Sequence, residues 1–449
     1  MKKILVSIIL LVSFFFIIKY NVENNTKLYF SYKKYIPSDY KKNIRSTLTK
    51  INTLYIYNTS NFTFKQKRGI KVNSLKDDRL MRVYTNSKLI WTGPRAYFSS
   101  NEDNLFIITG TGILMHVDKK DIVFDSNKIK FKKISTNLDE ILNNYIENNF
   151  FYSATSMVKS ILYKNDNLFI SLVQKIDKNC FTHIIYKGKL NFDNINFKEF
   201  YKFDRCKPFY TDYLGGSLAD YKDNKILVTI GDWTICEDFR WVDKNPKGFC
   251  TANGAQSLKT EFGKIFELDL TSKKLSLVSI GHDNPQGIIF NKEDDIIFST
   301  EHGPQGGDEI NINRYPSKKI KNFGYPISSY GEHYGYPSPD VNYLYEEAPL
   351  YKSHEKYGFE EPIDYFAPSI GISDIEKFDN KLLVASMGAE IEQGDLSLHI
   401  YTLDKDSNLI KKEWNKVYQR IRDIHIFNDY VFLFLESTGS IGVFHTKNL

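Results

Sequence analysis

The densest group of residues able to do chemistry is a glycine-rich run, STEHGPQGGDE, between Ser299 and Glu309. Its glycines reach backbone conformations that are closed to other residues, and Pro304 stiffens the turn. Such a loop can point main-chain carbonyls at a hard cation, and calcium takes oxygen ligands of this kind. Asp308 and Glu309 would supply negative charge. The alternative is a tight turn capped by its own carboxylates, and the residues alone leave both open.

Other polar segments are spread along the chain. GHDNPQG, at Gly281–Gly287, precedes the same hairpin as the glycine-rich run, so we expect the two to lie close together. Tyr213–Leu218, Val228–Asp232 and Arg420–Asp423 carry further polar groups. GGSLA, at Gly215–Ala219, approaches the hydrolase motif GxSxG but lacks its last glycine and the helix that should follow. The sequence therefore does not favour a serine hydrolase.

The elements that must position these residues are hairpins, which recur six times. Each is an apolar strand, a turn made of Asp, Asn, Lys or Glu, and a second apolar strand, which is the chemistry of a hairpin turn. The six copies are Asn101–Ile108, Lys164–Ser171, Tyr221–Val228, Asn291–Phe298, Phe378–Ala385 and Phe427–Leu433.

The spacing of the hairpins indicates the fold. They recur about every 65 residues, which exceeds the roughly 40–50 residues of compact propeller repeats, so long loops must be inserted. No GxGxxG motif or amphipathic helix pattern alternates with the strands, which disfavours a doubly wound sheet. We therefore predict an all-β, six-bladed β-propeller with long loops on one face. Strands near residues 50–95 should close it against the C-terminal strands.

The N-terminus predicts export. Lys2 and Lys3 precede an apolar run over residues 4–18, the pattern of a signal peptide or of a membrane anchor. No clear cleavage site follows. We expect residues 1–20 to be this signal or anchor helix, 21–45 a polar tether and 46–449 the propeller. The predicted location is extracytoplasmic, periplasmic or secreted, with a membrane tether through residues 4–18 if the segment is retained.

The four cysteines fit an oxidising compartment. Cys236 and Cys250 would pin one long loop, which leaves Cys180 and Cys206 as the other pair, although the sequence leaves all three connectivities open. No zinc-binding spacing occurs. The net charge of +6 is modest, and no basic stripe interleaves with aromatics, so we expect no nucleic-acid partner.

A long tyrosine-rich insertion lies between Gly303 and Pro368. It is either a covering loop packed by its own aromatic side chains or a lid whose rings stack on sugars.

Taken together, these segments resemble the quinoprotein glucose and sorbosone dehydrogenases, soluble aldose dehydrogenases that use pyrroloquinoline quinone (PQQ). The resemblance covers roughly residues 90–440. It is carried by GHDNPQG, STEHGPQGGDEINI, NFGYP at Asn322–Pro326, APS at Ala367–Ser369 and RIRD at Arg420–Asp423, with GGSLADYKDNKILVTIGD and FGKIFELDL in the family's order.

The resemblance implies a six-bladed propeller and a defined site. Calcium would be held partly by the carbonyls of Gly303 and Pro304, and it would polarise the quinone as a Lewis acid. Arg420 and Arg422 match the arginines that grip the cofactor's carboxylates. Asn284 matches a cofactor-contacting asparagine.

The same resemblance extends to the substrate. Asp232 matches an acidic residue of the substrate pocket. The implied reaction oxidises a sugar or related alcohol by hydride transfer to the quinone, which an external electron acceptor would then reoxidise.

The sequence also departs from the family pattern. Tyr213 stands where the family has its catalytic histidine, and with an ordinary pKa of about 10 it is a poor base at neutral pH. Asp283 and Ser217 stand where the family has arginines. A family lysine is replaced within Ser386–Ala389. Two arginines and the calcium turn are kept, while the base and part of the cofactor clamp are not.

Three hypotheses follow. The first is an exported PQQ- and calcium-dependent dehydrogenase. The second is a propeller of the same family that binds a carbohydrate or other ligand after losing the catalytic base. The third is a structural or partner-binding surface protein. Position 213 discriminates between the first two, because a base there favours catalysis.

Overall fold

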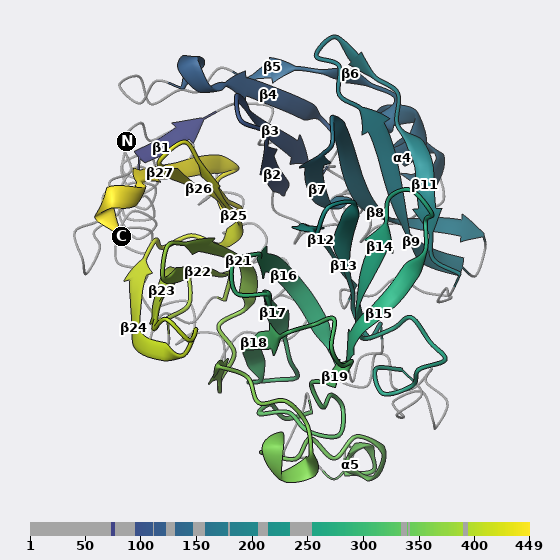
Figure 1. Cartoon of the computed structure of the whole chain (residues 1–449), viewed down its shortest axis with the longest axis vertical. Helices are drawn as coiled ribbons and strands as arrows, with labels where there is room; N and C mark the ends of the chain where they lie inside the picture. The colour runs from purple at the N-terminus through teal and green to yellow at the C-terminus, as the bar shows by residue number, and fades with distance from the viewer. Residues whose placement is uncertain are drawn as a thin grey trace, which may run out of the picture.

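The computed structural model describes residues 73–76, 95–110, 112–122, 131–146, 158–177, 180–204, 214–233, 254–333, 339, 342–388 and 394–449. Within them, six sheets of four or five strands surround one axis, as Figure 1 shows, and a small two-stranded sheet lies beside them. The α-helices of this part are short, α4 (Leu138–Ile146) and α5 (Leu344–Glu347). The prediction of an all-β, six-bladed propeller is confirmed.

Each blade is built from consecutive strands, counted outward from the axis. Blade 1 contains β2 (Ala96–Ser100), β3 (Asn104–Thr109), β4 (Leu114–Asp118) and β5 (Lys132–Lys133). Blade 2 contains β7 (Val158–Lys164), β8 (Asn167–Asp177), β9 (Cys180–Lys189) and β11 (Lys198–Lys202). Blade 3 contains β12 (Gly215–Tyr221), β13 (Lys225–Ile230), β14 (Lys264–Asp269) and β15 (Leu275–Ile280), with β19 (Lys321–Asn322) added at its edge.

The second half of the chain repeats this order. Blade 4 contains β16 (Asn284–Asn291), β17 (Ile296–His302), β18 (Asp308–Arg314) and β20 (Asp364–Phe366). Blade 5 contains β21 (Ile372–Phe378), β22 (Lys381–Ser386), β23 (Ser397–Leu403) and β24 (Leu409–Lys416). Blade 6 contains β25 (Ile421–Phe427), β26 (Tyr430–Leu435) and β27 (Ser440–His445), and the small separate sheet pairs β6 (Ser135–Thr136) with β10 (Asn194–Ile195).

The six hairpins expected from the sequence are the turns between the first and second strands of the six blades. Several of their polar residues adopt positive φ angles, as the turn chemistry requires. Asn165 has φ 51°, Asp295 52°, Asp379 50° and Asn428 47°. The innermost strands β2, β7, β12, β16, β21 and β25 therefore all run the same way along the axis, with their starts at one face and these turns at the other.

The ring is closed by a strand from the N-terminal part of the chain. Strand β1 (Asn73–Lys76) pairs antiparallel with β27, with Asn73 opposite Val443 and Lys76 opposite Ser440. It is the outermost strand of blade 6, so the last blade combines both ends of the propeller. This confirms the expected closure between strands near residues 50–95 and the C-terminal strands.

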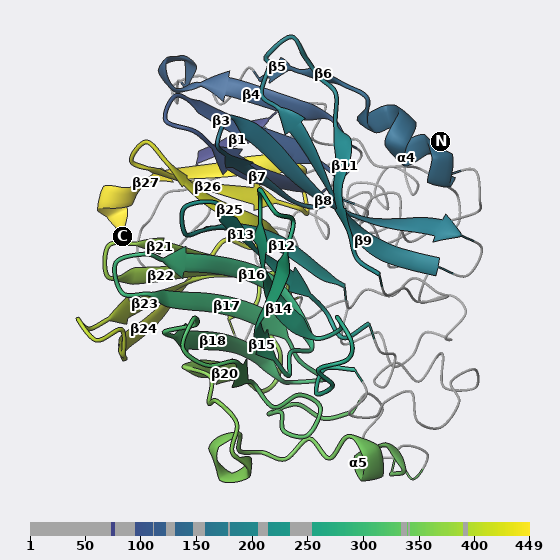
Figure 2. The same ribbon diagram turned by 45° about the vertical axis from the view of Figure 1, so that its right-hand side comes forward.

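Between neighbouring blades the described core forms six apolar clusters, one at each junction. Successive side chains of a strand point to opposite faces of the sheet, so one strand contributes to the clusters on both sides. In β3, Leu105 and Ile107 pack toward blade 6, whereas Phe106 and Ile108 pack toward blade 2. This explains why the strands read as continuous apolar runs. Figure 2 shows blade 4 (β16, β17, β18 and β20) beside blade 5 (β21–β24), whose facing sides form one of these clusters.

Side chains from one blade cap the inner edge of the next. Radial closure leaves the innermost strands with unpaired N–H groups toward the axis. Tyr163 N donates to Ser99 Oγ at 2.8 Å, and Leu218 N donates to Ser160 Oγ at 3.2 Å. At two other junctions a carboxylate accepts the bond, as in the 2.9 Å contact from Ile424 N to Asp374 Oδ2. The six sheets are thus joined by hydrogen bonds as well as by apolar packing.

Some expectations concern residues beyond the described ones. Residues 1–45, the predicted signal or anchor and tether, lie outside them, and none of the helices in the described ranges is long and apolar enough to cross a membrane. Cys180 is disulfide-bonded, while Cys206, Cys236 and Cys250 lie outside the described residues. The pairing of the cysteines stays a prediction.

Closure by β1 is testable by truncation. A chain that begins at residue 79 lacks β1 and exposes the edge of β27, whereas one that begins at residue 71 keeps the pairing. We expect the shorter chain to lose about 2–4 kcal/mol of unfolding free energy, at about 1 kcal/mol per backbone hydrogen bond. Denaturant unfolding measures this, and equal midpoints for the two chains would contradict the closure.

Candidate functional site

A cavity of about 370 Å³ lies where the innermost strands begin. All six of these strands contribute to it, and loops complete the wall. From the innermost strands come Tyr97, Lys159, Gly215, Ser217, Asn284, Gln286, Ser373, Arg422 and Asp423. His302 ends β17 and Asp308 begins β18, and from the loops come Arg95, Gly303, Ser369, Gly371, Met387 and Arg420. We call it the strand-start cavity. The topology thus gathers residues that are hundreds of positions apart.

The most strongly charged wall of this cavity is built on Glu436, whose side chain is 3% exposed. Arg422 Nη2 donates to both of its oxygens at 3.0 Å, and Arg420 Nε donates at 3.1 Å. Arg95 Nε lies 3.5 Å from Glu436 Oε1. Burial alone would raise the pKa of Glu436, but the three guanidiniums hold it well below its usual range. Because three guanidiniums surround one carboxylate, this wall keeps a net positive charge that can attract an anionic ligand.

The two predicted cofactor arginines differ in how they lie. Arg420 precedes β25 and its side chain is 43% exposed, whereas that of Arg422 is 7% exposed. Arg420 also donates to the carbonyl of Met387 in blade 5. Arg420 can therefore reach a ligand with its remaining donors, while Arg422 is fixed beneath it by Glu436. The structure brings both arginines to the cavity, as the resemblance implies.

Asn284 also lies in the wall of the cavity, at the start of β16. Its Oδ1 accepts from Gly215 N at 3.1 Å and from Gln286 Nε2 at 2.6 Å. Gly215 has φ 60°, and a Cβ on it would lie 2.8 Å from Gly231 N, so only glycine fits this approach. Strand β12 thus begins at the cavity. Tyr213, two residues earlier, lies outside the described residues.

The glycine-rich turn borders the cavity at Gly303. A Cβ on Gly303 would lie 2.0 Å from Gly307 O, and Pro304 O accepts from Gly307 N at 2.9 Å, so the turn folds tightly on itself. Asp308 does not cap this turn. Its Oδ2 accepts from Ile372 N of blade 5 at 2.8 Å.

This corner of the cavity fits a hard cation. Asp308 Oδ1 is buried and has no hydrogen-bond partner among the described residues, with His302 Nδ1 at 3.5 Å. Asp308 lines the same cavity as Gly303, whose carbonyl the resemblance assigns to calcium together with that of Pro304. The described ranges contain no cluster of three or more His, Cys, Asp or Glu that could hold a metal. A cation here would therefore rely on main-chain and ligand oxygens.

The substrate-pocket role of Asp232 stays a prediction. Asp232 is buried, and it is not among the described residues that line the strand-start cavity. Its N–H donates to Asp283 O at 2.6 Å. Burial lowers the pKa of Lys264 to about 8, and the charge of Asp232 opposes that shift. The structure therefore places Asp232 as a charge partner of buried Lys264 behind the wall.

The tyrosine-rich insertion packs on itself. Tyr330 stacks on Tyr365 with ring centroids 3.6 Å apart, and Tyr351 stacks on Tyr357 at 4.0 Å. At the base of the insertion, a hydrogen bond of 3.1 Å joins His354 Nε2 and Glu309 Oε1. No described residue between Asp308 and Ser369 lines the strand-start cavity. This favours the interpretation as an aromatic-packed covering loop over a sugar-stacking lid.

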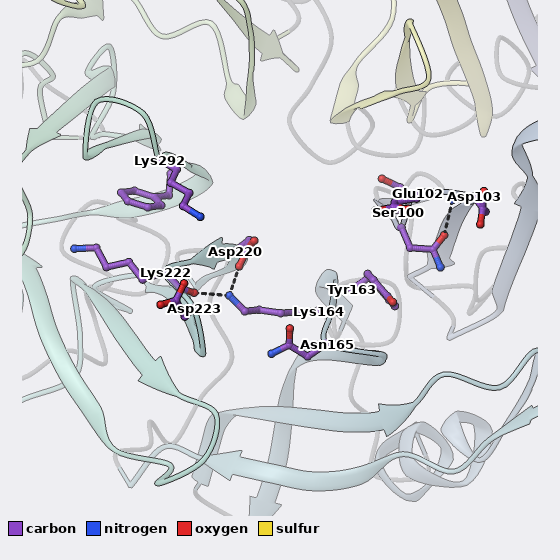
Figure 3. A pocket seen from close by; sticks show the side chains of 12 residues that line it. Ser100, Glu102, Asp103, Tyr163, Lys164, Asn165, Asp220, Lys222, Asp223 and Lys292 are labelled. Atoms are coloured by element: carbon purple, nitrogen blue, oxygen red, sulfur yellow. Dashed lines mark hydrogen bonds and ion pairs between the residues drawn. The ribbon is translucent and has the colours of Figure 1, made fainter.

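A second cavity, of about 660 Å³, lies at the other end of the axis among the hairpin turns. Figure 3 shows it from close by. Lys164 crosses to Asp220 of the next blade and donates to the carbonyl of Lys222 at 2.7 Å. Ser100, at the end of β2, lines the same cavity. We call it the turn-end cavity.

Sequence reasoning missed three residues of the charged wall. Arg95 and Lys159 line the cavity without belonging to any motif. The sequence does give a hint for Glu436, because this acidic residue directly follows the apolar run of β26. Its carboxylate must therefore lie at the end of a buried strand. That position could have been paired with the two arginines at the start of β25, since adjacent strands of one hairpin bring them together.

Comparisons with known proteins agree with this architecture. The model of the family described as Glucose / Sorbosone dehydrogenase matches residues 156–443. The chain is 30% identical over 176 residues to the aldose sugar dehydrogenase YliI of Escherichia coli, covering 36% of this chain and 42% of that protein. It is 25% identical over 231 residues to an uncharacterized protein of Synechocystis, covering 47% and 50%. The matches thus span half or less of these curated relatives.

The fold is shared with solved structures. The apo form of the soluble aldose sugar dehydrogenase of Escherichia coli superposes with a TM-score of 0.55 at 18% identity, covering 78% of this chain and 95% of that one. At this identity the likeness concerns the fold alone.

The arrangement around Glu436 predicts a pH-dependent contribution to stability. Because its pKa is lowered on folding, its contribution is present above the ordinary glutamate pKa of about 4.3 and is lost as the pH falls below it. Glu436→Gln should therefore cost about 3–5 kcal/mol at pH 7, the cost of breaking a buried ion pair, and less at pH 3. Denaturant unfolding across pH checks this against Glu293→Gln, a change in an exposed turn. A cost that does not change with pH would contradict the electrostatic account.

Proposed function

Because the chain belongs to the glucose/sorbosone dehydrogenase family, we propose that it is a sugar dehydrogenase-like oxidoreductase that binds PQQ and calcium in the strand-start cavity. The observation that carries this proposal is the set of three guanidiniums around Glu436 beside the glycine-rich turn. An anionic cofactor with several carboxylates matches the surplus of positive charge. A cation matches the Gly303–Pro304 corner with its buried Asp308.

The chain's own residues have distinct tasks in this proposal. Arg420 holds a cofactor carboxylate from the open side, and Arg422 holds one from below, fixed by Glu436. Asn284 is oriented for the cofactor by its bond from Gly215. The Gly303 and Pro304 carbonyls would hold calcium. When bound, the quinone supplies a two-electron acceptor and calcium supplies Lewis acidity.

The substrate of the proposed reaction is a small sugar or related alcohol, oxidised at its hydroxyl-bearing carbon. Its hydroxyl proton needs an acceptor, and Tyr213 takes the position of the family histidine. An external electron acceptor completes the cycle. We further propose that the protein works outside the cytoplasm, exported by the apolar segment at residues 4–18, which tethers it to the membrane if retained.

The second candidate is a non-catalytic carbohydrate- or ligand-binding propeller of the same family. Two observations favour it. The family's base and one arginine of the clamp are replaced by Tyr213 and Asp283. Asp232, the predicted acidic residue of the substrate pocket, is not among the described residues that line the strand-start cavity. In this case the cationic cavity binds an anionic or polar ligand without turnover.

Calorimetric titration of the purified protein with PQQ in calcium buffer tests the binding step. Arg420→Ala removes one or two charge-assisted hydrogen bonds, each worth about 1.5–3 kcal/mol, so affinity should fall about 10- to 100-fold. Arg314→Ala is the matched control, since Arg314 donates to Asp406 O at the surface. Absence of quinone binding by the unaltered protein at micromolar concentration would refute the cofactor proposal.

Dye reduction with a panel of aldoses separates the two candidates. If turnover is seen, Tyr213→Phe should lower it by about 100-fold or more, the range for lost general-base catalysis. Tyr315→Phe, at an exposed tyrosine, should leave it unchanged. Quinone binding without turnover would select the binding propeller, and turnover unaffected by Tyr213→Phe would exclude Tyr213 as the base.

A further inference from the structure

Four ionisable side chains lie on two neighbouring inner strands, between the two cavities. Strand β21 carries Asp374 and Glu376, and strand β25 carries Asp423 and His425, in each case two residues apart and so on one face of the strand. Asp423 lines the strand-start cavity. His425 lies toward the hairpin turns, where Ser100 lines the turn-end cavity.

The first pair of these side chains consists of two neighbouring carboxyls. Asp374 bonds to the residue that follows Asp423, so the two carboxyls lie at the same junction of blades 5 and 6. Each accepts a backbone N–H, Asp374 Oδ2 from Ile424 at 2.9 Å and Asp423 Oδ2 from Phe98 at 2.6 Å. Burial, with the other carboxylates nearby, raises the pKa of both. Two such groups cannot both be ionised at low cost, so the pair holds one proton.

The second pair continues toward the other face. His425 Nδ1 lies 3.4 Å from Glu376 Oε1, and His425 Nε2 lies 2.8 Å from Ser100 Oγ. The imidazole therefore has a carboxylate on one nitrogen and a hydroxyl on the other. Imidazole can accept a proton on one nitrogen and release the other proton from its second nitrogen. Ser100, labelled in Figure 3, links this pair to the turn-end cavity.

Capping of strand edges does not account for the acids. Asp374 and Asp423 cap the inner edges of blades 6 and 1, but Ser99 and Ser160 perform the same task at two other junctions with neutral hydroxyls. A hydroxyl would avoid the repulsion between neighbouring carboxylates. The use of acids at two adjacent junctions, one of them in the cavity wall, therefore points to a role for their proton.

Other charged groups around the carboxyl pair limit where its proton can go. Glu376 and His425 lie on the side toward the turns. On the cavity side, Arg422 is bonded to Glu436. Burial raises the pKa of Tyr97, so its hydroxyl stays neutral near Asp423. His302 and Asp308 also line the strand-start cavity. Glu376 and His425 offer acceptors for the pair's proton on the turn side.

We propose that Asp423, Asp374, Glu376 and His425 form a proton relay that carries protons from the strand-start cavity to the turn-end cavity. The proposal rests on the proposed dehydrogenase function, in which oxidation of an alcohol to a carbonyl sends one hydride to the quinone and releases one proton. That proton joins the carboxyl pair, the pair's proton passes to Glu376 and His425, and one proton leaves past Ser100 into water. Atoms and charge balance with no further reactant.

An infrared titration of the protein without quinone tests the shared proton independently of turnover. The unaltered protein should show a protonated-carboxyl band that persists to near neutral pH. In Asp374→Asn this band should weaken and titrate at lower pH, because Asp423 stays buried but lacks its acidic neighbour. Asp379→Asn, in an exposed turn, is the matched control. Absence of a difference between the unaltered protein and Asp374→Asn above pH 5 would overturn the relay.

Stopped-flow detection of released protons with a pH-indicator dye tests transfer in the quinone-loaded enzyme. His425→Gln keeps a polar side chain but cannot carry a proton, so proton release should lag quinone reduction about tenfold, with quinone affinity unchanged. His116→Gln, at a buried histidine of blade 1, is the control. Proton release in step with quinone reduction in His425→Gln would overturn the relay. An unaltered enzyme without turnover would instead refute the proposed function and the catalytic use of the relay, while the infrared titration would still decide whether the shared proton exists.

Discussion

The buried carboxylate of Glu436 is the interaction on which the candidate site depends. It draws together Arg420 and Arg422 of blade 6 and Arg95 at the entry to blade 1, while Arg420 reaches on to Met387 of blade 5. Three guanidiniums without a counter-charge would repel one another in a region from which water is largely excluded. With one carboxylate at their centre they are fixed, and a net positive charge still faces the cavity. The same contact joins the first and last blades at the inner end, as β1 joins them at the outer edge.

Radial closure then explains why the molecule has two cavities of different character. All six innermost strands run in one direction, so their starts meet at one face and their hairpin turns at the other. Long loops lead into the starts of the innermost strands and bring glycine-rich turns, arginines and asparagines to that face. The hairpin turns at the other face are short and carry Asp, Asn and Lys. The inner edges between the two ends need caps for their N–H groups, and the choice of Asp374 and Asp423 over serine adds ionisable groups along the axis. The innermost strands therefore both close the fold and carry the residues of the proposed chemistry.

The sequence predicted the fold well because a hairpin is a local event. Polar residues that tolerate positive φ recur between apolar strands, and each instance marks the start of a blade. The site was predicted where it lies in contiguous motifs, as for Asn284, Gly303 and the Arg420/Arg422 pair, all of which reach the cavity. It was not predicted where it depends on a single charge from a distant blade, as for Arg95 and Glu436. The effect of Asp232 on the pKa of buried Lys264 likewise depends on tertiary packing, which motif position does not reveal.

The central claim is that the strand-start cavity is the cofactor site, organised by the arginines around Glu436. The most direct measurement is a crystal structure of the protein grown with PQQ and calcium. The account predicts quinone density in the strand-start cavity, with its carboxylates against Arg420 and Arg422 and a calcium ion between the quinone and the Gly303–Pro304 carbonyls. Quinone density elsewhere, or a strand-start cavity that holds only solvent under saturating ligand, would contradict it.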